Sequence, residues 1–362
     1  MDTETLGFVA EWYDPQPQIT RRFLIKVFTD AKCLEIVDLK SKKGFLKRSP
    51  LPQGVAVSEF VLGGKVLLYA RLMHIVDYAD SYTRRKLAPL ANKAVVVVSP
   101  DGYGRVGQVL EDFIAQGLCV SKLQSVLLSE TEALELVELV SVGPSQPAEQ
   151  LTKLFTSGPS VAVELSGASA PDRVSDLLPD IRRKLHAQGV EAVVWKGEYL
   201  DDFFFGGSRH FQSTARLSNC TCAVIRPHAV KNGDFARILD EIQAAGFGIT
   251  AMQMFELNPT AAKEFLEVYD GVLPNFSEIV QQFCTGPCVA LEVVSRDPSI
   301  DVVGSFREFL GPWDVEMAKE LKPQTIRAKY GVSRALNAIH CTDLPEDGVT
   351  ESAYFFDLLQ NS

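Results

Sequence analysis

The sequence contains one pattern twice, and this repeat constrains the fold more than any other feature. In each copy an apolar segment is followed by apolar residues at helical spacing and then by a glycine, Gly117 or Gly246. The separation between the copies is nearly constant, which indicates two units that each begin with a strand, a helix and a second strand. The matching segments are 93–101 with 220–228, and 155–165 with 283–293.

The first 90 residues have a different pattern, in which short β-rich segments are separated by turn signals. Apolar side chains alternate over 23–28, and the segments 33–39 and 65–77 are further β-rich candidates. Short strands with frequent turns predict a small barrel or sandwich. We therefore expect an α+β protein in which a β-rich domain over 1–90 ends at a linker over 88–92 and precedes two α/β units.

Charge and composition exclude several classes of protein. The net charge is −10, yet the first 90 residues are basic and the remainder is acidic. Such a chain is a poor candidate for binding nucleic acid, although its front end could dock on an acidic protein. No apolar run reaches the about 20 residues that cross a bilayer, and the start lacks a secretory pattern. The seven cysteines lack metal or disulfide spacing, which indicates a reduced compartment such as the cytoplasm.

Several short motifs follow one another in the second copy. They are Arg226-Pro227-His228, Thr285-Gly286-Pro287, the segment 306–311, Thr325-Ile326-Arg327, and the segment 337–343 that contains His340. In this order and spacing they resemble the nucleoside diphosphate kinases, whose active-site signature reads Asn-x-x-His-Gly-Ser-Asp. The resemblance implies ferredoxin-like antiparallel sheets in two units, over 92–212 and 218–358.

The resemblance also implies a histidine that accepts a phosphoryl group, a task that an imidazole nitrogen can perform. His340 is the candidate nucleophile, Glu351 holds its other ring nitrogen, and Thr342 is the hydroxyl partner of Glu351. Mg²⁺ bound with the nucleotide is the implied cofactor, without a metal site in the protein itself. The implied nucleotide-binding residues are Arg307 and Arg327 on the phosphates, Asn337 on the ribose, Tyr269 beside the histidine and Phe276 against the base.

Two departures from the family pattern concern the phosphates. Arg226 stands where the family has a lysine, and Trp313 stands where it has a threonine, in a loop that is longer than usual. The first copy departs further, because Ser99 takes the lysine position and the clamp loop is missing between Leu178 and Ile181. The region that matches the histidine motif, 194–198, contains no histidine. We expect the first unit to be catalytically inactive.

Two other motifs receive structural interpretations. Gly102, Gly104 and Gly107 form the GxGxxG pattern of dinucleotide sites, but the matching segment 230–235 of the second copy lacks it. We interpret these glycines as serving the turn into a helix. The aromatic run 203–205 matches the end of the last helix of the kinase unit, and we expect it in the core.

The whole chain is similar to the ciliary branch of this family, in which a DM-ten domain precedes two kinase units. The segments that carry this similarity are 8–14, 45–48, 75–84 and 341–348. Membership implies a microtubule inner protein of axonemal doublet microtubules in a cilium or flagellum, also linked to centrosomal γ-tubulin complexes. Its partners would be tubulin and other axonemal proteins, together with ATP or another nucleotide.

Two functions stay open. One is a structural axonemal protein with residual nucleotide binding, and the other is an active kinase that moves the γ-phosphate of ATP to nucleoside diphosphates through His340. The loss of one site while its apolar repeat survives favours the structural function. Whether the two units pair with each other also stays open, although their covalent linkage raises the effective concentration for pairing.

Overall fold

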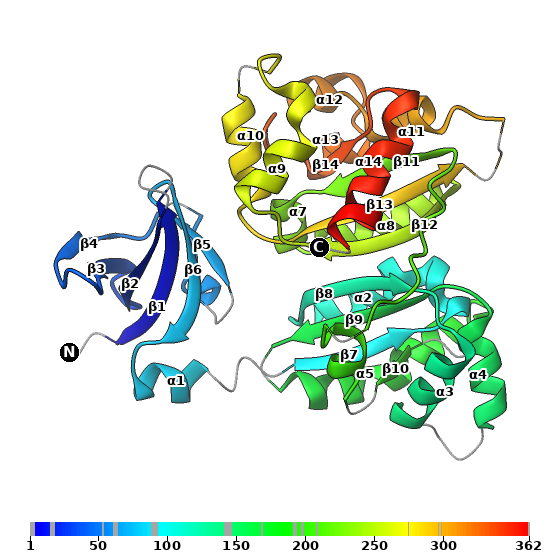
Figure 1. Ribbon diagram of the computed structural model, residues 1–362, viewed down its shortest axis with the longest axis horizontal. Coiled ribbons are helices and arrows are strands. Elements are labelled where there is room, and N and C mark those ends of the chain that lie inside the picture. Colours follow the sequence, from blue (N-terminus) through cyan, green and yellow to red (C-terminus); the bar gives the residue numbers. More distant parts are fainter. Residues whose placement is uncertain are drawn as a thin grey trace. The chain divides into compact units, whose positions relative to one another are not determined.

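The computed structural model of the chain divides into two compact units, Met1–Asn92 and Lys93–Ser362 (Figure 1). The expected β-rich domain over 1–90 falls within the first of these units, and the expected linker over 88–92 lies outside the described residues. The structure describes residues 4–14, 19–52, 54–60, 64–87, 93–140, 147–167, 169–190, 194–196, 199–207, 209–273, 275–295, 297 and 299–360.

The first unit is built on an antiparallel sheet with the strand order β4-β3-β2-β1-β6-β5. Alternate side chains of these strands enter one buried cluster, in which Phe8, Phe23 and Phe60 are almost fully shielded from solvent. The β-rich prediction is therefore confirmed, but the strand pairings form one sheet with two edges instead of the expected barrel or sandwich. The elements are β1 (Thr5–Asp14), β2 (Ile19–Phe28), β3 (Cys33–Asp38), β4 (Gly44–Pro50), η1 (Val57–Glu59), β5 (Lys65–Leu68), β6 (Arg71–Tyr78) and α1 (Ser81–Leu87).

The β-rich segment expected over 65–77 is a hairpin of two strands, β5 and β6. Tyr69 and Ala70 form its turn with φ values of 47° and 64°, in the left-handed region that tight hairpin turns require. Neither residue is a glycine or an asparagine, so the sequence carries no turn signal at this point.

The second unit contains one antiparallel sheet that runs through both copies of the repeat, in the order β10-β7-β9-β8-β12-β13-β11-β14. We call residues 93–212 the front half and residues 218–360 the rear half. When the strands are numbered within each half, both halves have the ferredoxin-like order 4-1-3-2. The strands are β7 (Lys93–Val98), β8 (Cys119–Val126), β9 (Ser160–Ser166), β10 (Val194–Lys196), β11 (Cys220–Ile225), β12 (Phe247–Phe255), β13 (Cys288–Ser295) and β14 (Ile339–Cys341).

Each half also contains helices, which are more numerous in the rear half. In the front half they are η3 (Pro100–Arg105), α2 (Val106–Ala115), α3 (Glu130–Leu139), α4 (Ala148–Thr156), α5 (Ala170–His186) and α6 (Leu200–Phe205). In the rear half they are α7 (Pro227–Lys231), α8 (Asp234–Ala244), α9 (Pro259–Phe265), η4 (Glu267–Tyr269), α10 (Phe276–Phe283), α11 (Val302–Leu310), α12 (Val315–Leu321), α13 (Ile326–Tyr330), η5 (Pro345–Asp347), α14 (Gly348–Ala353) and η6 (Tyr354–Leu359). The predicted helix ends are confirmed, because Gly117 and Gly246 follow α2 and α8 with φ values of 74° and 91°.

The two halves pair with each other along a seam, which answers a question that the sequence left open. At the seam β8 lies beside β12, α2 packs on α8, and one buried apolar cluster takes side chains from both halves. The hydroxyl of Tyr103 donates to the carbonyl oxygen of Thr250 at 3.2 Å.

Gly107 lies inside α2, where a Cβ would stand 2.5 Å from the carbonyl oxygen of Ala236 in α8. Its interpretation as a turn residue is therefore wrong: the lack of a side chain permits close approach of the helices.

The halves differ after their third strands (Figure 1). The front half has the single 17-residue helix α5, whereas the rear half has the three helices α11, α12 and α13. The expected core position of the aromatic run is confirmed for Phe203 and Phe204, which are buried in α6, while Phe205 is half-buried. Within the described ranges, no helix combines the length and apolar character that crossing a membrane requires.

Candidate active site

His340 lies in the short strand β14, which pairs with β11 and forms the edge of the sheet. Its side chain is 1% exposed. The chain enters this strand through Ala338, whose φ of 71° is left-handed and costs a non-glycine residue about 1 kcal/mol or more. The carbonyl oxygen of Ala338 accepts a hydrogen bond from the backbone N–H of Arg226 at 2.8 Å. This hydrogen bond fixes the backbone just before His340 against the end of β11.

The imidazole of His340 is held from one side. Its Nε2 lies 3.0 Å from Oε2 of Glu351 in α14, and Thr342 donates its hydroxyl to the same oxygen at 3.1 Å. Because a carboxylate only accepts, this contact assigns the ring proton to Nε2 and leaves a lone pair on Nδ1. Nδ1 is buried and has no hydrogen-bond partner among the described residues. The expected grouping of these three side chains is present.

Aromatic rings line the other sides of the imidazole. The rings of Phe265 and Tyr269 meet it edge to face, with centroids 4.9 Å and 6.2 Å away. The hydroxyl of Tyr269 donates to the carboxylate of Asp343, and burial together with this bond raises the pKa of Tyr269. Tyr269 therefore lies beside the histidine, as expected, and stays protonated at neutral pH.

Arg226 is fully buried at the end of β11. Its Nη1 donates to the carbonyl oxygen of Ala335 at 2.7 Å, while its Nε and Nη2 have no partner among the described residues. The guanidinium carbon lies 4.8 Å from the ring centroid of Phe283 and 5.3 Å from that of Trp313. Burial, and next the charge of Arg327, lower the pKa of Arg226 to about 9. The side chain still carries its charge at neutral pH.

Asn337 and Arg327 complete the buried polar groups around His340. Arg327, in α13, donates from Nη1 to the carbonyl oxygen of Gly311 at 2.8 Å and from Nε to the carbonyl oxygen of Ile339 at 3.2 Å. Asn337 is fully buried, and its amide oxygen and nitrogen lack a partner within the described part of the chain. A buried polar group without a partner costs about 1–3 kcal/mol, so such groups mark positions that a polar ligand would satisfy.

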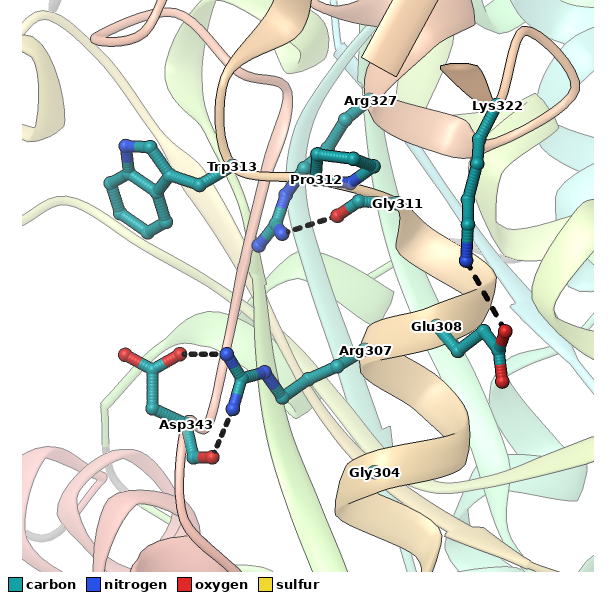
Figure 2. A pocket seen from close by; sticks show the side chains of 9 residues that line it. All are labelled: Gly304, Arg307, Glu308, Gly311, Pro312, Trp313, Lys322, Arg327 and Asp343. Carbon is teal, nitrogen blue, oxygen red and sulfur yellow. Dashed lines mark hydrogen bonds and ion pairs between the residues drawn. The ribbon is translucent and has the colours of Figure 1, made fainter. Parts of the chain in front are cut away.

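An open pocket of about 380 Å³ adjoins this buried cluster (Figure 2). Figure 2 shows Arg307 turned toward Asp343, with Nη2 and Oδ1 3.2 Å apart, and Lys322 turned toward Glu308. Arg307 and Arg327 both line this pocket, as expected of residues that clamp phosphates. The lining residues are Gly304, Arg307, Glu308, Gly311, Pro312, Trp313, Lys322, Arg327 and Asp343.

The structure does not bring every expected residue to the pocket. Phe276 is half-buried at the start of α10 and is not part of the pocket lining. Asp343 belongs to the histidine motif and contacts both Tyr269 and Arg307, but the sequence indicated no role for it. Trp313 was recognisable in the sequence only as a departure from the family pattern. That departure was itself the signal that this side chain shapes the site.

The front half lacks a corresponding cluster. Ser99 is buried at the end of β7, where the rear half has Arg226. The described part of the motif region, β10, contains no histidine, while residues 197–198 lie outside the described residues. His186 is exposed at the end of α5. The described residues of the front half therefore offer no buried histidine that could act as a nucleophile.

Comparisons with known proteins complete this description. The family model "Nucleoside diphosphate kinase" matches residues 219–360. "Nucleoside diphosphate kinase homolog 7" of Mus musculus is 33% identical over 380 aligned positions, which cover 99% of this chain and 94% of that protein. The protein of the same description from Rattus norvegicus is 34% identical over the same shares. A "Nucleoside diphosphate kinase" of Aquifex aeolicus is 35% identical over 140 positions, which cover 39% of this chain and 95% of that protein.

Proposed function

This chain belongs to the nucleoside diphosphate kinase family, and from this premise we propose that its rear half binds nucleotides and accepts a phosphoryl group on His340. The observation that carries the proposal is the buried Nδ1 of His340, which has a lone pair but no partner among the described residues, while Glu351 holds Nε2. Such an arrangement suits a nucleophile whose proton sits on the far nitrogen.

In the proposed reaction, Nδ1 of His340 attacks the γ-phosphorus of a nucleoside triphosphate. The bond from that phosphorus to the β,γ-bridging oxygen breaks, and the nucleoside diphosphate leaves with the electron pair. A second nucleoside diphosphate then takes the phosphoryl group by the reverse displacement. Glu351 accepts the hydrogen bond of the Nε2 proton throughout and stabilises the positive charge that the ring gains.

Cationic side chains supply the electrostatic part of the proposed reaction, because phosphoryl transfer depends mainly on positioning and charge stabilisation. Arg307 and Arg327 line the pocket, which supports a role for both in binding phosphate oxygens. The Nε and Nη2 of Arg226 and the amide of Asn337, which have no partner among the described residues, can donate to a phosphate and to a ribose hydroxyl.

Mg²⁺ is expected to bind together with the nucleotide. The described residues contain no group of three or more His, Cys, Asp or Glu side chains that could hold a metal ion. Mg²⁺ usually keeps several waters and is bound through substrate phosphates with one or two carboxylates, so the nucleotide would supply most of its contacts in the protein-bound state. When bound, the ion would neutralise phosphate charge.

Incubation with γ-labelled ATP tests the proposal. We expect acid-labile, alkali-stable label on the wild-type protein and none on His340→Gln. His210→Gln is the matched control, because His210 is an exposed histidine of the front half, and it should be labelled like the wild type. A wild-type protein that takes no label would contradict the proposal.

A second function is favoured by a different observation. The front half keeps a complete sheet order and a packed core, although its described residues offer no nucleophilic histidine. We propose that this half and the basic first unit are binding surfaces, and that the protein is a structural part of axonemal doublet microtubules in cilia or flagella. Tubulin and neighbouring axonemal proteins would be its partners. Both functions can reside in one chain.

Extraction of axonemes tests this second function. The chain should stay with the doublet microtubules after treatment with detergent and then with salt, because an inner protein is held by many contacts. Release of the chain with the soluble fraction would contradict the structural function and would leave the proposed chemistry of His340 untouched.

A further inference from the structure

The reactive nitrogen of the proposed kinase is closed off from the pocket that should receive the phosphates. His340 is 1% exposed, and Arg226 and Asn337 are fully buried. None of these three residues belongs to the lining of the 380 Å³ pocket. A phosphorus atom has to reach bonding distance of Nδ1, so some side chain between the pocket and the histidine has to move.

Trp313 occupies the boundary between the two regions. It lines the pocket, and its ring centroid lies 5.3 Å from the guanidinium carbon of Arg226 and 5.5 Å from that of Arg327. On a third side its ring lies 5.9 Å from the ring of Tyr269, which itself contacts His340. Figure 2 shows the indole on the same side of Arg327 as Asp343. The indole thus contacts Arg327, which lines the pocket, and also Arg226 and Tyr269, which do not.

The backbone on each side of Trp313 is fixed, which leaves the indole as the part that can turn. Gly311 has a φ of 87°, its carbonyl oxygen accepts from Arg327, and a Cβ on it would stand 2.3 Å from Oγ1 of Thr325. Asp314 accepts from Nε of Arg334 at 2.6 Å and from backbone N–H groups at the start of α12. Two anchored residues, Gly311 and Asp314, therefore flank the segment that carries Trp313.

We propose that Trp313 is a gate, which closes the phosphate side of the His340 site and turns away when a nucleotide binds. The inference rests on the proposed function and specifies how access to that site is regulated. Phosphate oxygens can displace the indole because a charge-assisted hydrogen bond to a guanidinium is stronger than a cation–π contact. The closed gate lowers nucleotide affinity, since part of the binding energy is used to open it.

Substitution of the gate gives the test. ADP binding by calorimetry and the rate of labelling by γ-labelled ATP are measured for the wild type, Trp313→Thr, Trp313→Phe and Leu321→Ala. We expect Trp313→Thr to bind ADP about tenfold more tightly, because the nucleotide no longer has to break the two cation–π contacts of the indole. A tenfold change corresponds to about 1.4 kcal/mol, which is within the range of two such contacts. Trp313→Phe should lie between it and the wild type. Leu321→Ala, on the exposed face of α12, is the matched control and should equal the wild type.

A second readout follows the indole directly. In a protein that carries Trp12→Phe and Trp195→Phe, Trp313 is the remaining tryptophan of the three in the sequence. ADP should shift its emission to longer wavelength, because the ring moves from half-buried surroundings into water. Thermal unfolding of each variant shows that it is folded.

The outcomes separate the gate from the proposed function. If the wild type binds ADP and takes label while Trp313→Thr and Trp313→Phe bind no more tightly and the emission does not shift, the gate is wrong and the kinase function stands. If neither the wild type nor Trp313→Thr binds ADP or takes label on His340, the proposed function fails and the gate fails with it.

Discussion

The front and rear halves of the second unit share a strand order and a seam but differ in one segment. In the front half, α5 runs unbroken from Ala170 to His186. In the rear half, the matching region contains α11, α12 and α13, with Trp313 between the first two and Arg327 in the third. The segment without a counterpart in α5 lies between Leu310 and Ile326, two residues of the buried core, and it contains Trp313 and α12. The sheet order is the same in both halves with and without this segment, so the fold does not depend on it.

Glu351→Gln should produce the largest effect on the proposed chemistry of the rear half. The amide cannot stabilise the charged ring as the carboxylate does, so the labelling rate of His340 should fall by about 100- to 10,000-fold. Rapid-quench labelling with γ-labelled ATP measures this rate. Glu346→Gln, an exposed substitution shortly before it, is the control. Equal rates for the wild type and Glu351→Gln would show that this carboxylate has no part in the reaction.

Phe155→Ala and Phe283→Ala test whether the two cores are equally packed. These residues occupy equivalent positions of the repeat, at the ends of α4 and α10, and both are fully buried. Each substitution should reduce the free energy of unfolding by about 3–5 kcal/mol, measured by chemical denaturation. Only Phe283→Ala should also slow labelling, because Phe283 stacks on Arg226. A much smaller cost at Phe155 would mean that the front half is loosely packed.

Gly107→Ala tests the seam. The added methyl would meet the carbonyl oxygen of Ala236, a backbone atom that cannot turn away, so we expect a loss of about 1–3 kcal/mol in the free energy of unfolding. Gly104→Ala is a matched control, because a Cβ there would meet no atom within 4 Å. If both alanine variants are as stable as the wild type, the two helices do not approach as closely as described.

The smallest expected effect on stability concerns Glu164, a buried carboxylate of the front half. Burial favours its neutral form, but hydrogen bonds from Lys93, Ser121 and Lys122 outweigh burial and lower the pKa of Glu164 to about 2. Because the pKa of Glu164 is lower in the folded state, its charged form stabilises the fold when the pH is above the unfolded-state pKa of about 4.3. This stabilisation is lost as the pH falls toward 2.

The corresponding measurement compares the wild type with Glu164→Gln by denaturation between pH 7 and pH 2. At pH 7 the wild type should be more stable than Glu164→Gln by about 1–2 kcal/mol, a small value because both lysines are partly exposed to solvent. The difference should shrink below pH 4. Glu149→Gln, an exposed residue of α4, should differ little from the wild type at any pH. A difference that does not change with pH would contradict the assignment of this pKa.

Much of the second unit could be predicted from local patterns. The repeated apolar spacing gave both helices and their glycine ends, since a helix and its cap are encoded within a few residues. The grouping of His340, Glu351 and Thr342 was implied by the resemblance to the nucleoside diphosphate kinases, whose motif lies within one short stretch of chain. These features depend on residues that are near one another in the sequence.

Other features depend on contacts between distant residues and could not be predicted. The stacking of Trp313 on Arg226 joins two loops that are far apart in the sequence. The role of Gly107 depends on a carbonyl oxygen of another helix, and the tight turn at Tyr69 uses residues that are rare in such turns. In each case the deciding partner is set by tertiary packing.

The two halves have the same strand order but should differ in their capacity to carry a phosphoryl group. Mass spectrometry can locate phosphohistidine after incubation of the wild-type chain with ATP at alkaline pH. We expect phosphate on His340 and none on His186 or His210 of the front half. Phosphate on either front-half histidine, or a phosphorylated chain with His340 unmodified, would contradict this expectation.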